Sequence, residues 1–176
     1  CEKSPNGKEY TGFYHDFEMG VYAANIKCGQ LLVVMNPCES GGFVDTIIDR
    51  VSKSENGPKK TVVTAASSDN QLAWTLSLEE KDMIKLDHGG FSALFYSALN
   101  GGTPEDVKEK LPGYMKGETL NPDVDGDGKV SIKDAWSWTE YIMKNHRVIT
   151  MLGLETPQYG EYPKGSGDDM FLGEPE

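Results

Sequence analysis

The 176-residue sequence lacks any long hydrophobic run, and it is poor in cysteine, in histidine and in basic side chains. Its longest apolar run, residues 31–35, falls far short of the ~20 residues needed to span a bilayer. Lys and Arg number 17 against 28 Asp and Glu, which gives a net charge of −11. This balance argues against nucleic acid or an anionic membrane as a partner, because both attract basic surfaces. Three cysteines are too few for a disulfide scaffold, and their odd number leaves at least one thiol unpaired.

The sequence begins with Cys1 rather than Met and carries no signal peptide. We therefore expect a processed chain or a fragment whose export signal has been removed. A lipid-modified Cys1 is one alternative, which would make the chain a lipid-anchored structural protein. If the protein is secreted, Cys1 and Cys28 are candidates for a disulfide that leaves Cys38 free. Residues 1–15 are polar and are predicted to form an arm, and residues 16–176 are predicted to belong to one folded unit.

Hydrophobic periodicity predicts alternating strands and helices. Helices are expected over 16–28, 43–51, 91–99 and 132–146, and strands over 31–35 and 61–66. This alternation predicts an α/β fold with a parallel sheet, whose first strand is apolar enough to be buried on both faces. Residues 67–87 are expected to be mostly loop, and the tail from residue 153 to have little regular structure apart from 170–172. Two strands are too few to bury these helices, so we expect the rest of the sheet to come from elsewhere.

Cys38 follows the first strand directly and precedes a helix, within the turn Pro-Cys-Glu-Ser-Gly-Gly at 37–42. Open α/β sheets bind ligands beyond the carboxyl ends of their strands, so chemistry is expected at this turn. The N-terminus of the next helix favours negative charge, which suits a reactive thiolate. The alternative interpretation is a small buried residue that ends the strand.

The segment Pro-Cys-Glu-Ser-Gly-Gly-Phe at 37–43 resembles the nucleophile motif of the legumain-like cysteine peptidases, within the caspase and clostripain fold. The similarity continues at Val-Val-Thr-Ala-Ala-Ser-Ser (62–68), at Asp-His-Gly-Gly-Phe-Ser (87–92) and at Glu-Thr-Pro-Gln (155–158). The resemblance implies a caspase-like parallel sheet flanked by helices, of which this chain is the C-terminal portion. It also implies that Cys38 is the catalytic nucleophile.

The family places its catalytic histidine in a His-Gly turn after an earlier strand, and none of the three histidines fits that place. His15 is interpreted as a surface or N-cap residue, His88 lies downstream of the nucleophile, and His146 is expected near a helix C-terminus. A thiol that attacks an amide needs an imidazole to move its proton. We therefore expect the base, with its strand, on an N-terminal chain of the same precursor that is cleaved but stays associated. The alternative is an inactive relative.

The resemblance also indicates a substrate pocket. Ser67, Ser68 and Asp87 match the places that line the family's specificity pocket, with Trp74 as a wall. A carboxylate in that pocket favours Asn, Lys or Arg at the cleavage position. The alternative for Asp87 is a solvated loop or N-cap residue.

Residues 123–134 fit a twelve-residue calcium loop. Asp123, Asp125 and Asp127 occupy positions 1, 3 and 5, Lys129 offers its carbonyl at 7, and Asp134 stands at 12. Gly128 supplies the turn at position 6, and Ser131 stands at position 9. Because the chain has a single such loop, we expect a structural Ca²⁺ clamp in an extracytoplasmic or secreted protein rather than a sensor. The alternative is a solvated acidic turn.

The sequence therefore predicts a calcium-stabilised cysteine endopeptidase subunit that hydrolyses peptides through Cys38 and an acyl-enzyme. The main alternative is a caspase-fold calcium-binding module without catalytic activity.

Overall fold

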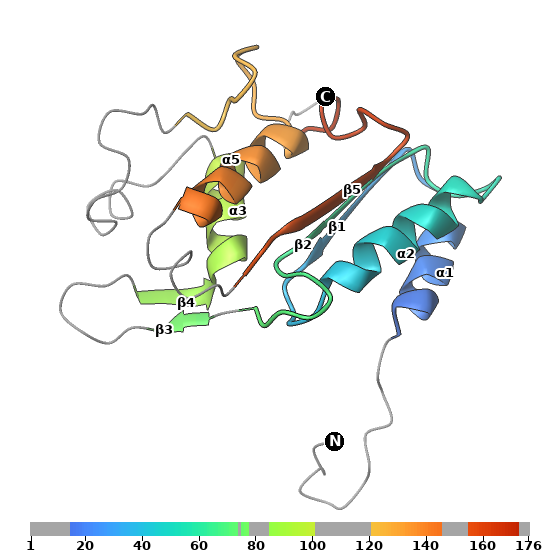
Figure 1. Cartoon of the computed structure of the whole chain (residues 1–176). Coiled ribbons are helices and arrows are strands. Elements are labelled where there is room, and N and C mark those ends of the chain that lie inside the picture. The colour runs from blue at the N-terminus through green and yellow to red at the C-terminus, as the bar shows by residue number, and fades with distance from the viewer. Residues whose placement is uncertain (1–14, 74, 78–84, 101–120, 146–154, 173–176) are drawn as a thin grey trace, which may run out of the picture.

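A small mixed β-sheet lies between two layers of helices (Figure 1). The structure is a computed structural model, and it describes residues 15–73, 75–77, 85–100, 121–145 and 155–172. The described elements follow the order α1 (Asp16–Asn25), β1 (Gln30–Met35), α2 (Gly41–Ser52), β2 (Lys60–Ala65), β3 (Thr75–Ser77), β4 (Lys85–Gly89), α3 (Gly90–Leu99), α5 (Ile132–Asn145) and β5 (Gln158–Tyr162). The predicted α/β class is confirmed.

The sheet has the strand order β1-β2-β5. Strands β1 and β2 are parallel, as the sequence predicted, and they pair from Gln30 with Lys60 to Met35 with Ala65. The third strand is antiparallel and pairs with β2 from Thr61 with Tyr162 to Ala65 with Gln158. The expectation of little regular structure in the tail was therefore wrong for β5, and the sheet is mixed rather than purely parallel.

The prediction that the first strand is buried on both faces was also wrong. β1 lies at the edge of the described sheet, its residues are half-buried or exposed, and Val34 is 43% exposed. Strand β2 occupies the centre instead, with five of its six residues buried. No other strand in the described part of the chain pairs with the outer edge of β1.

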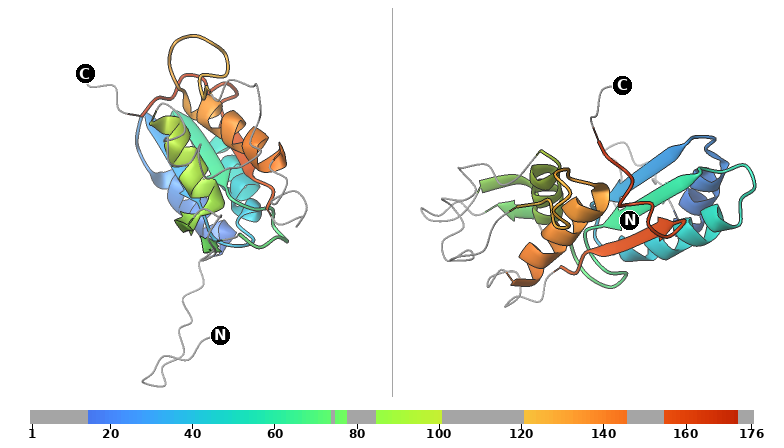
Figure 2. Two further views of the ribbon diagram at one scale, coloured as in Figure 1. Left: turned by 90° about the vertical axis from the view of Figure 1, so that its left-hand side faces the viewer. Right: turned by 90° about the horizontal axis from the view of Figure 1, so that it is seen from above.

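Helices α1 and α2 cover one face of the sheet, and α3 and α5 cover the other (Figures 1 and 2). Val44, Ile47 and Val51 of α2 pack with Ala23 of α1 and Val63 of β2. Each helix buries residues three or four positions apart, which is the spacing of one helical face. The sequence predicted these helices because that spacing is local.

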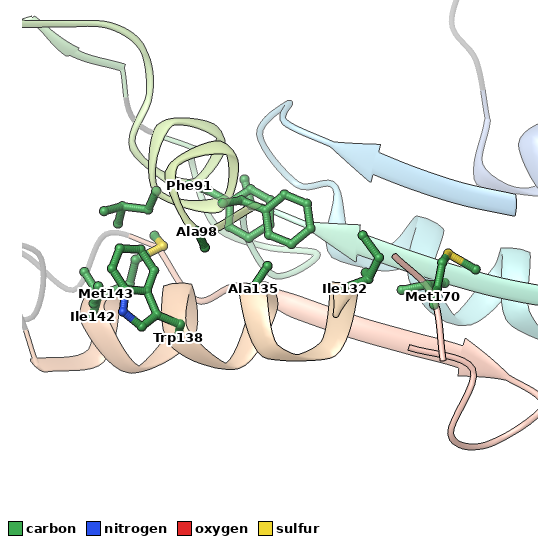
Figure 3. Packing of buried hydrophobic residues seen from close by; sticks show 12 residues of the cluster. Phe91, Ala98, Ile132, Ala135, Trp138, Ile142, Met143 and Met170 are labelled. Carbon is green, nitrogen blue, oxygen red and sulfur yellow. The ribbon is translucent and has the colours of Figure 1, made fainter. Parts of the chain in front are cut away.

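The larger core lies between α3, α5 and the sheet (Figure 3). Phe91 and Ala98 of α3 face Ile132, Ala135 and Ile142 of α5, and Met170 of the tail closes the end near Ile132. All of these side chains are at most 2% exposed.

Strand β5 depends on a glycine. A Cβ at Gly160 would lie 2.7 Å from Val44 Cγ1 and 2.9 Å from Ile48 Cγ1, so only glycine lets α2 pack this closely on β5. A sequence such as Gln-Tyr-Gly-Glu-Tyr carries no local strand pattern, and the pairing with β2 decides its conformation.

The predicted long loop at 67–87 contains two further strands. β3 and β4 form an antiparallel pair, from Thr75 with Gly89 to Ser77 with Lys85. The expectation of loop there was wrong, because a hairpin this short leaves no periodic pattern. Among the described residues, no helix has the length and apolarity needed to cross a membrane.

Candidate functional site

Cys38 lies three residues beyond the carboxyl end of β1, and it is exposed. The residue after it, Glu39, has a φ of 57°, a left-handed conformation that costs a non-glycine residue roughly 1–2 kcal/mol. Ser40 is then the N-cap of α2. The strained residue turns the chain from strand to helix at once and leaves the thiol on the outside of the bend.

The segment that follows β2 lies against this turn. The Ala73 N–H donates to Cys38 Sγ at 3.3 Å, and the thiol lies 3.6 Å from the Ala73 carbonyl oxygen. The Glu39 N–H donates to the Gln71 carbonyl at 2.8 Å. Residues 71–73 therefore run alongside residues 38 and 39 and fix the position of the thiol.

A glycine at the start of α2 allows this close approach. A Cβ at Gly41 would lie 2.8 Å from Ser68 Cα, from Ser68 C and from Asp69 N, all of them backbone atoms. The next glycine, Gly42, has room, since its Cβ would come no closer than 3.9 Å to Asp69 Cβ. The two adjacent glycines thus serve different purposes.

The predicted substrate-binding residues have different environments. Ser67 is fully buried and its hydroxyl donates to the Pro37 carbonyl at 3.5 Å. It therefore supports the turn at residues 37–42 that carries Cys38, called the cysteine turn below. Ser68 is half-buried and its hydroxyl donates to Asn70 Oδ1 at 2.9 Å. The backbone of Asp87 belongs to β4, while its side chain, like all of Trp74, lies outside the described part of the structure.

The end of β4 nevertheless reaches the cysteine turn. A Cβ at Gly89 would lie 2.7 Å from both Nδ2 and Oδ1 of Asn36, the first residue after β1. Ala73 precedes β3 by two residues and Gly89 is the last residue of β4, so the end of the β3–β4 pair at which Thr75 pairs with Gly89 lies against residues 36–38. The strand that carries Asp87 is therefore anchored two residues from Cys38.

His15 is the one histidine whose side chain falls within the described residues, and it is the N-cap of α1, as predicted. The backbone N–H of His15 donates to the Glu18 carboxylate at 3.2 Å. The side chain of His88 and all of His146 lie outside the described residues. Within the described part of the chain, no imidazole forms a hydrogen bond with Cys38.

Two buried polar atoms beside the cysteine turn have no hydrogen-bond partner among the described residues. They are the hydroxyl oxygen of Ser40, a residue with no exposed surface, and the side-chain carbonyl oxygen of Gln71. An unpaired buried polar atom is costly, so both atoms lower the stability of this turn. Sequence reasoning missed Gln71, Leu72 and Ala73, because only the return of the chain after β2 brings them to Cys38.

The predicted calcium loop at residues 123–134, called the acidic loop below, brings three of its carboxylates together. Oxygens of Asp123, Asp125 and Asp134 all lie within 4.8 Å of one another, whereas Asp127 is not part of this group and accepts the Lys129 N–H at 2.8 Å. Gly126 and Gly128 have positive φ values of 79° and 91°, which glycine adopts without strain. Clustered oxygen ligands on a tight turn fit Ca²⁺.

The charges of this loop repel one another. A hydrogen bond from the Asp127 N–H lowers the pKa of Asp125, but desolvation and the carboxylates of Asp134, Asp127 and Asp123 together raise it above its usual range. A bound cation would relieve this repulsion.

Asp134 also joins the loop to α5. Its carboxylate accepts the Ser131 N–H at 3.0 Å and the Ser131 hydroxyl at 2.7 Å, while its own N–H donates to the Ser131 hydroxyl. Between Ser131 and Asp134, the Ile132 N–H donates to the Met170 carbonyl and the Lys133 N–H donates to the Gly167 carbonyl. The start of α5 therefore holds the acidic loop and the tail together.

Glu161 organises the tail after β5. Its carboxylate accepts the Gly165 N–H at 2.8 Å, the Gly167 N–H at 2.9 Å and the Tyr159 hydroxyl at 2.9 Å. Burial by itself raises the pKa of Glu161, but these three donors and the Lys133 charge outweigh it and hold the pKa below its usual range. Burial, together with this same carboxylate, raises the pKa of Tyr159.

No family model, curated protein or solved structure matches the chain.

Proposed function

We propose that this chain is the nucleophile-bearing subunit of a cysteine endopeptidase. The observation that carries the proposal is the exposed Cys38 on a strained strand–turn–helix at the carboxyl end of β1. Strained turns of this kind are a recurrent way to expose a nucleophile. The resemblance of residues 37–43 to the legumain-like nucleophile motif supports the same assignment.

In the proposed reaction, Cys38 Sγ attacks the carbonyl carbon of the substrate peptide bond. An imidazole accepts the thiol proton and passes it to the amine, which leaves as the C–N bond breaks. Water then attacks the thioester, which releases the carboxylic acid and restores the thiol. The Cys38 N–H supplies one donor for the oxyanion, and a second donor comes from the partner.

The partner is an N-terminal chain of the same precursor, and it adds a strand to β1 that carries the catalytic histidine. The outer edge of β1, with which no strand in the described ranges pairs, supports this part of the proposal. The position of α1 supports it too. Helices α1 and α2 cover the same face of the sheet. A parallel strand on the outer edge of β1, connected to β1 through α1, would therefore make a crossover of the same hand as the connection from β1 through α2 to β2. Parallel crossovers in proteins are almost always right-handed.

The proposed substrates are peptides cleaved after Asn, Lys or Arg, because the resemblance assigns Asp87 to the specificity pocket, and Asp87 belongs to β4, whose last residue, Gly89, lies against Asn36. Ser68 is the second proposed contact, and Ser67 acts by supporting the turn. Ca²⁺ bound through Asp123, Asp125 and Asp134, with Asp127 and the Lys129 carbonyl as further ligands, stabilises the subunit. Weak structural calcium sites are typical of extracellular modules, which accords with an extracytoplasmic location.

The acidic loop also favours a second candidate, a calcium-stabilised binding module without activity. The two candidates differ in what they require of Cys38, so one experiment separates them.

The test compares Cys38→Ala with Cys28→Ala in the native assembly, using fluorogenic peptides with Asn, Lys, Arg or Asp before the cleaved bond. Cys28 is the matched control, because it forms no disulfide within the described residues, from which Cys1 is excluded, and its Sγ donates to the Gln30 carbonyl at 3.2 Å. We expect Cys38→Ala to abolish cleavage and labelling by a peptidyl electrophile, and Cys28→Ala to preserve both. Mass spectrometry of the native material should find a second chain with a His-Gly turn. Cleavage that survives Cys38→Ala would exclude the peptidase proposal.

A further inference from the structure

Leu72 lies closer to the candidate nucleophile than any sequence pattern suggested. Its two neighbours hold the cysteine turn, since the Gln71 carbonyl accepts the Glu39 N–H at 2.8 Å and the Ala73 N–H reaches Cys38 Sγ at 3.3 Å. The residue between them is therefore fixed beside the thiol by both flanking hydrogen bonds.

Leu72 is 57% exposed. Its polar neighbours Asp69 and Asn70 are exposed as well, and Pro37, next to Cys38 on the other segment, is also exposed. Single exposed leucines are common on protein surfaces and by themselves mean little. This one differs because the backbone on both of its sides contacts the nucleophile turn.

Residues 71–73 border Cys38 on the side where the Ala73 N–H contacts Sγ, so a peptide whose carbonyl carbon approaches Sγ from that side passes the 71–73 segment. Its side chain on that side would meet the apolar surface of Leu72, bounded by polar residues. We propose that Leu72 is a specificity-determining residue, which selects substrates with an aliphatic or aromatic side chain next to the cleaved residue. This inference rests on the proposed peptidase function and extends it from the cleaved residue to its neighbour.

The test uses the native assembly and a peptide series with a constant cleaved residue and Leu or Ser at one neighbouring position at a time. One added or missing aliphatic contact in an apolar site changes kcat/KM about ten-fold or more. We expect the wild type to prefer Leu over Ser by about ten-fold at one position. Leu72→Ser should reduce this ratio to about one, and Leu72→Met should retain it.

Leu172→Ser is the matched control, because Leu172 is 54% exposed and belongs to the tail. A second readout is the binding of the same peptide pair to Cys38→Ala and to Cys38→Ala with Leu72→Ser, measured by calorimetry. Wild-type cleavage without a preference for Leu, or a preference unchanged in Leu72→Ser, would overturn this inference and leave the peptidase proposal standing. A wild-type assembly that cleaves no peptide would overturn both.

Discussion

The two adjacent glycines at the start of α2 predict opposite effects of the same substitution. A Cβ at Gly41 would lie 2.8 Å from three backbone atoms of Ser68 and Asp69, and backbone atoms cannot rotate away as a flexible side chain can. A Cβ at Gly42 would meet nothing closer than 3.9 Å. The pair therefore separates the cost of crowding from the general effect of alanine in a helix.

The magnitudes follow from these distances. Forcing extra atoms into a packed site costs about 1–3 kcal/mol, whereas alanine in a helix is favoured over glycine by about 0.5–1 kcal/mol. Gly41→Ala should thus lower the free energy of unfolding by about 1–2 kcal/mol, and Gly42→Ala should raise it by about 0.5–1 kcal/mol. For a chain of this size, the two melting temperatures should differ by roughly 5–10 °C.

The assay is thermal and urea unfolding of both variants beside the wild type, with the rate of Cys38 alkylation by iodoacetamide as a local readout. Gly41→Ala should change that rate, because the 67–73 segment that contacts Sγ must move away from α2. Gly42→Ala should leave it unchanged. Equal melting temperatures for the two variants would refute the close packing of α2 on residues 68 and 69, and with it our account of how the thiol is positioned.

Two further predictions concern the acidic loop and the tail. Ca²⁺ at a hundred-fold excess over its Kd should stabilise the protein by about 2.7 kcal/mol. Asp125→Asn keeps an oxygen that accepts the Asp127 N–H, and it should remove most of this stabilisation. Asp49→Asn on α2 is the control and should retain the stabilisation. A melting temperature insensitive to Ca²⁺ and to EDTA would contradict the calcium site. Because the folded-state pKa of Glu161 is depressed, its carboxylate stabilises the fold above the usual glutamate pKa of about 4.3, and that stability is lost as the pH falls through the depressed value. Glu161→Gln should therefore melt below the wild type at pH 7 and approach it in acid, and a difference independent of pH would contradict the proposed role of the charge.

Local patterns predicted much of the fold. The helices beginning near residues 16, 41, 90 and 132 and the parallel pair β1–β2 were confirmed, because apolar residues at helical or strand spacing report which face of an element is buried. The N-cap position of His15 was confirmed for a similar reason, since capping depends on the next few residues. The roles of Cys38, of Asp87 and of the acidic loop remain predictions.

The sequence by itself determined the order of α1, β1, α2, β2, α3 and α5, the tight turn that carries Cys38 and the spacing of the acidic loop, since each of these depends on residues close together in the chain. Only the tertiary structure decided that β5 joins the sheet antiparallel and that residues 71–73 lie against the thiol. It also decided that Gly160 lets α2 pack on β5 and that Gly41 lets α2 pack on residues 68 and 69. Those contacts join residues more than 25 positions apart. Their free energy comes from surfaces that meet only when the chain has packed, so no local pattern reports them.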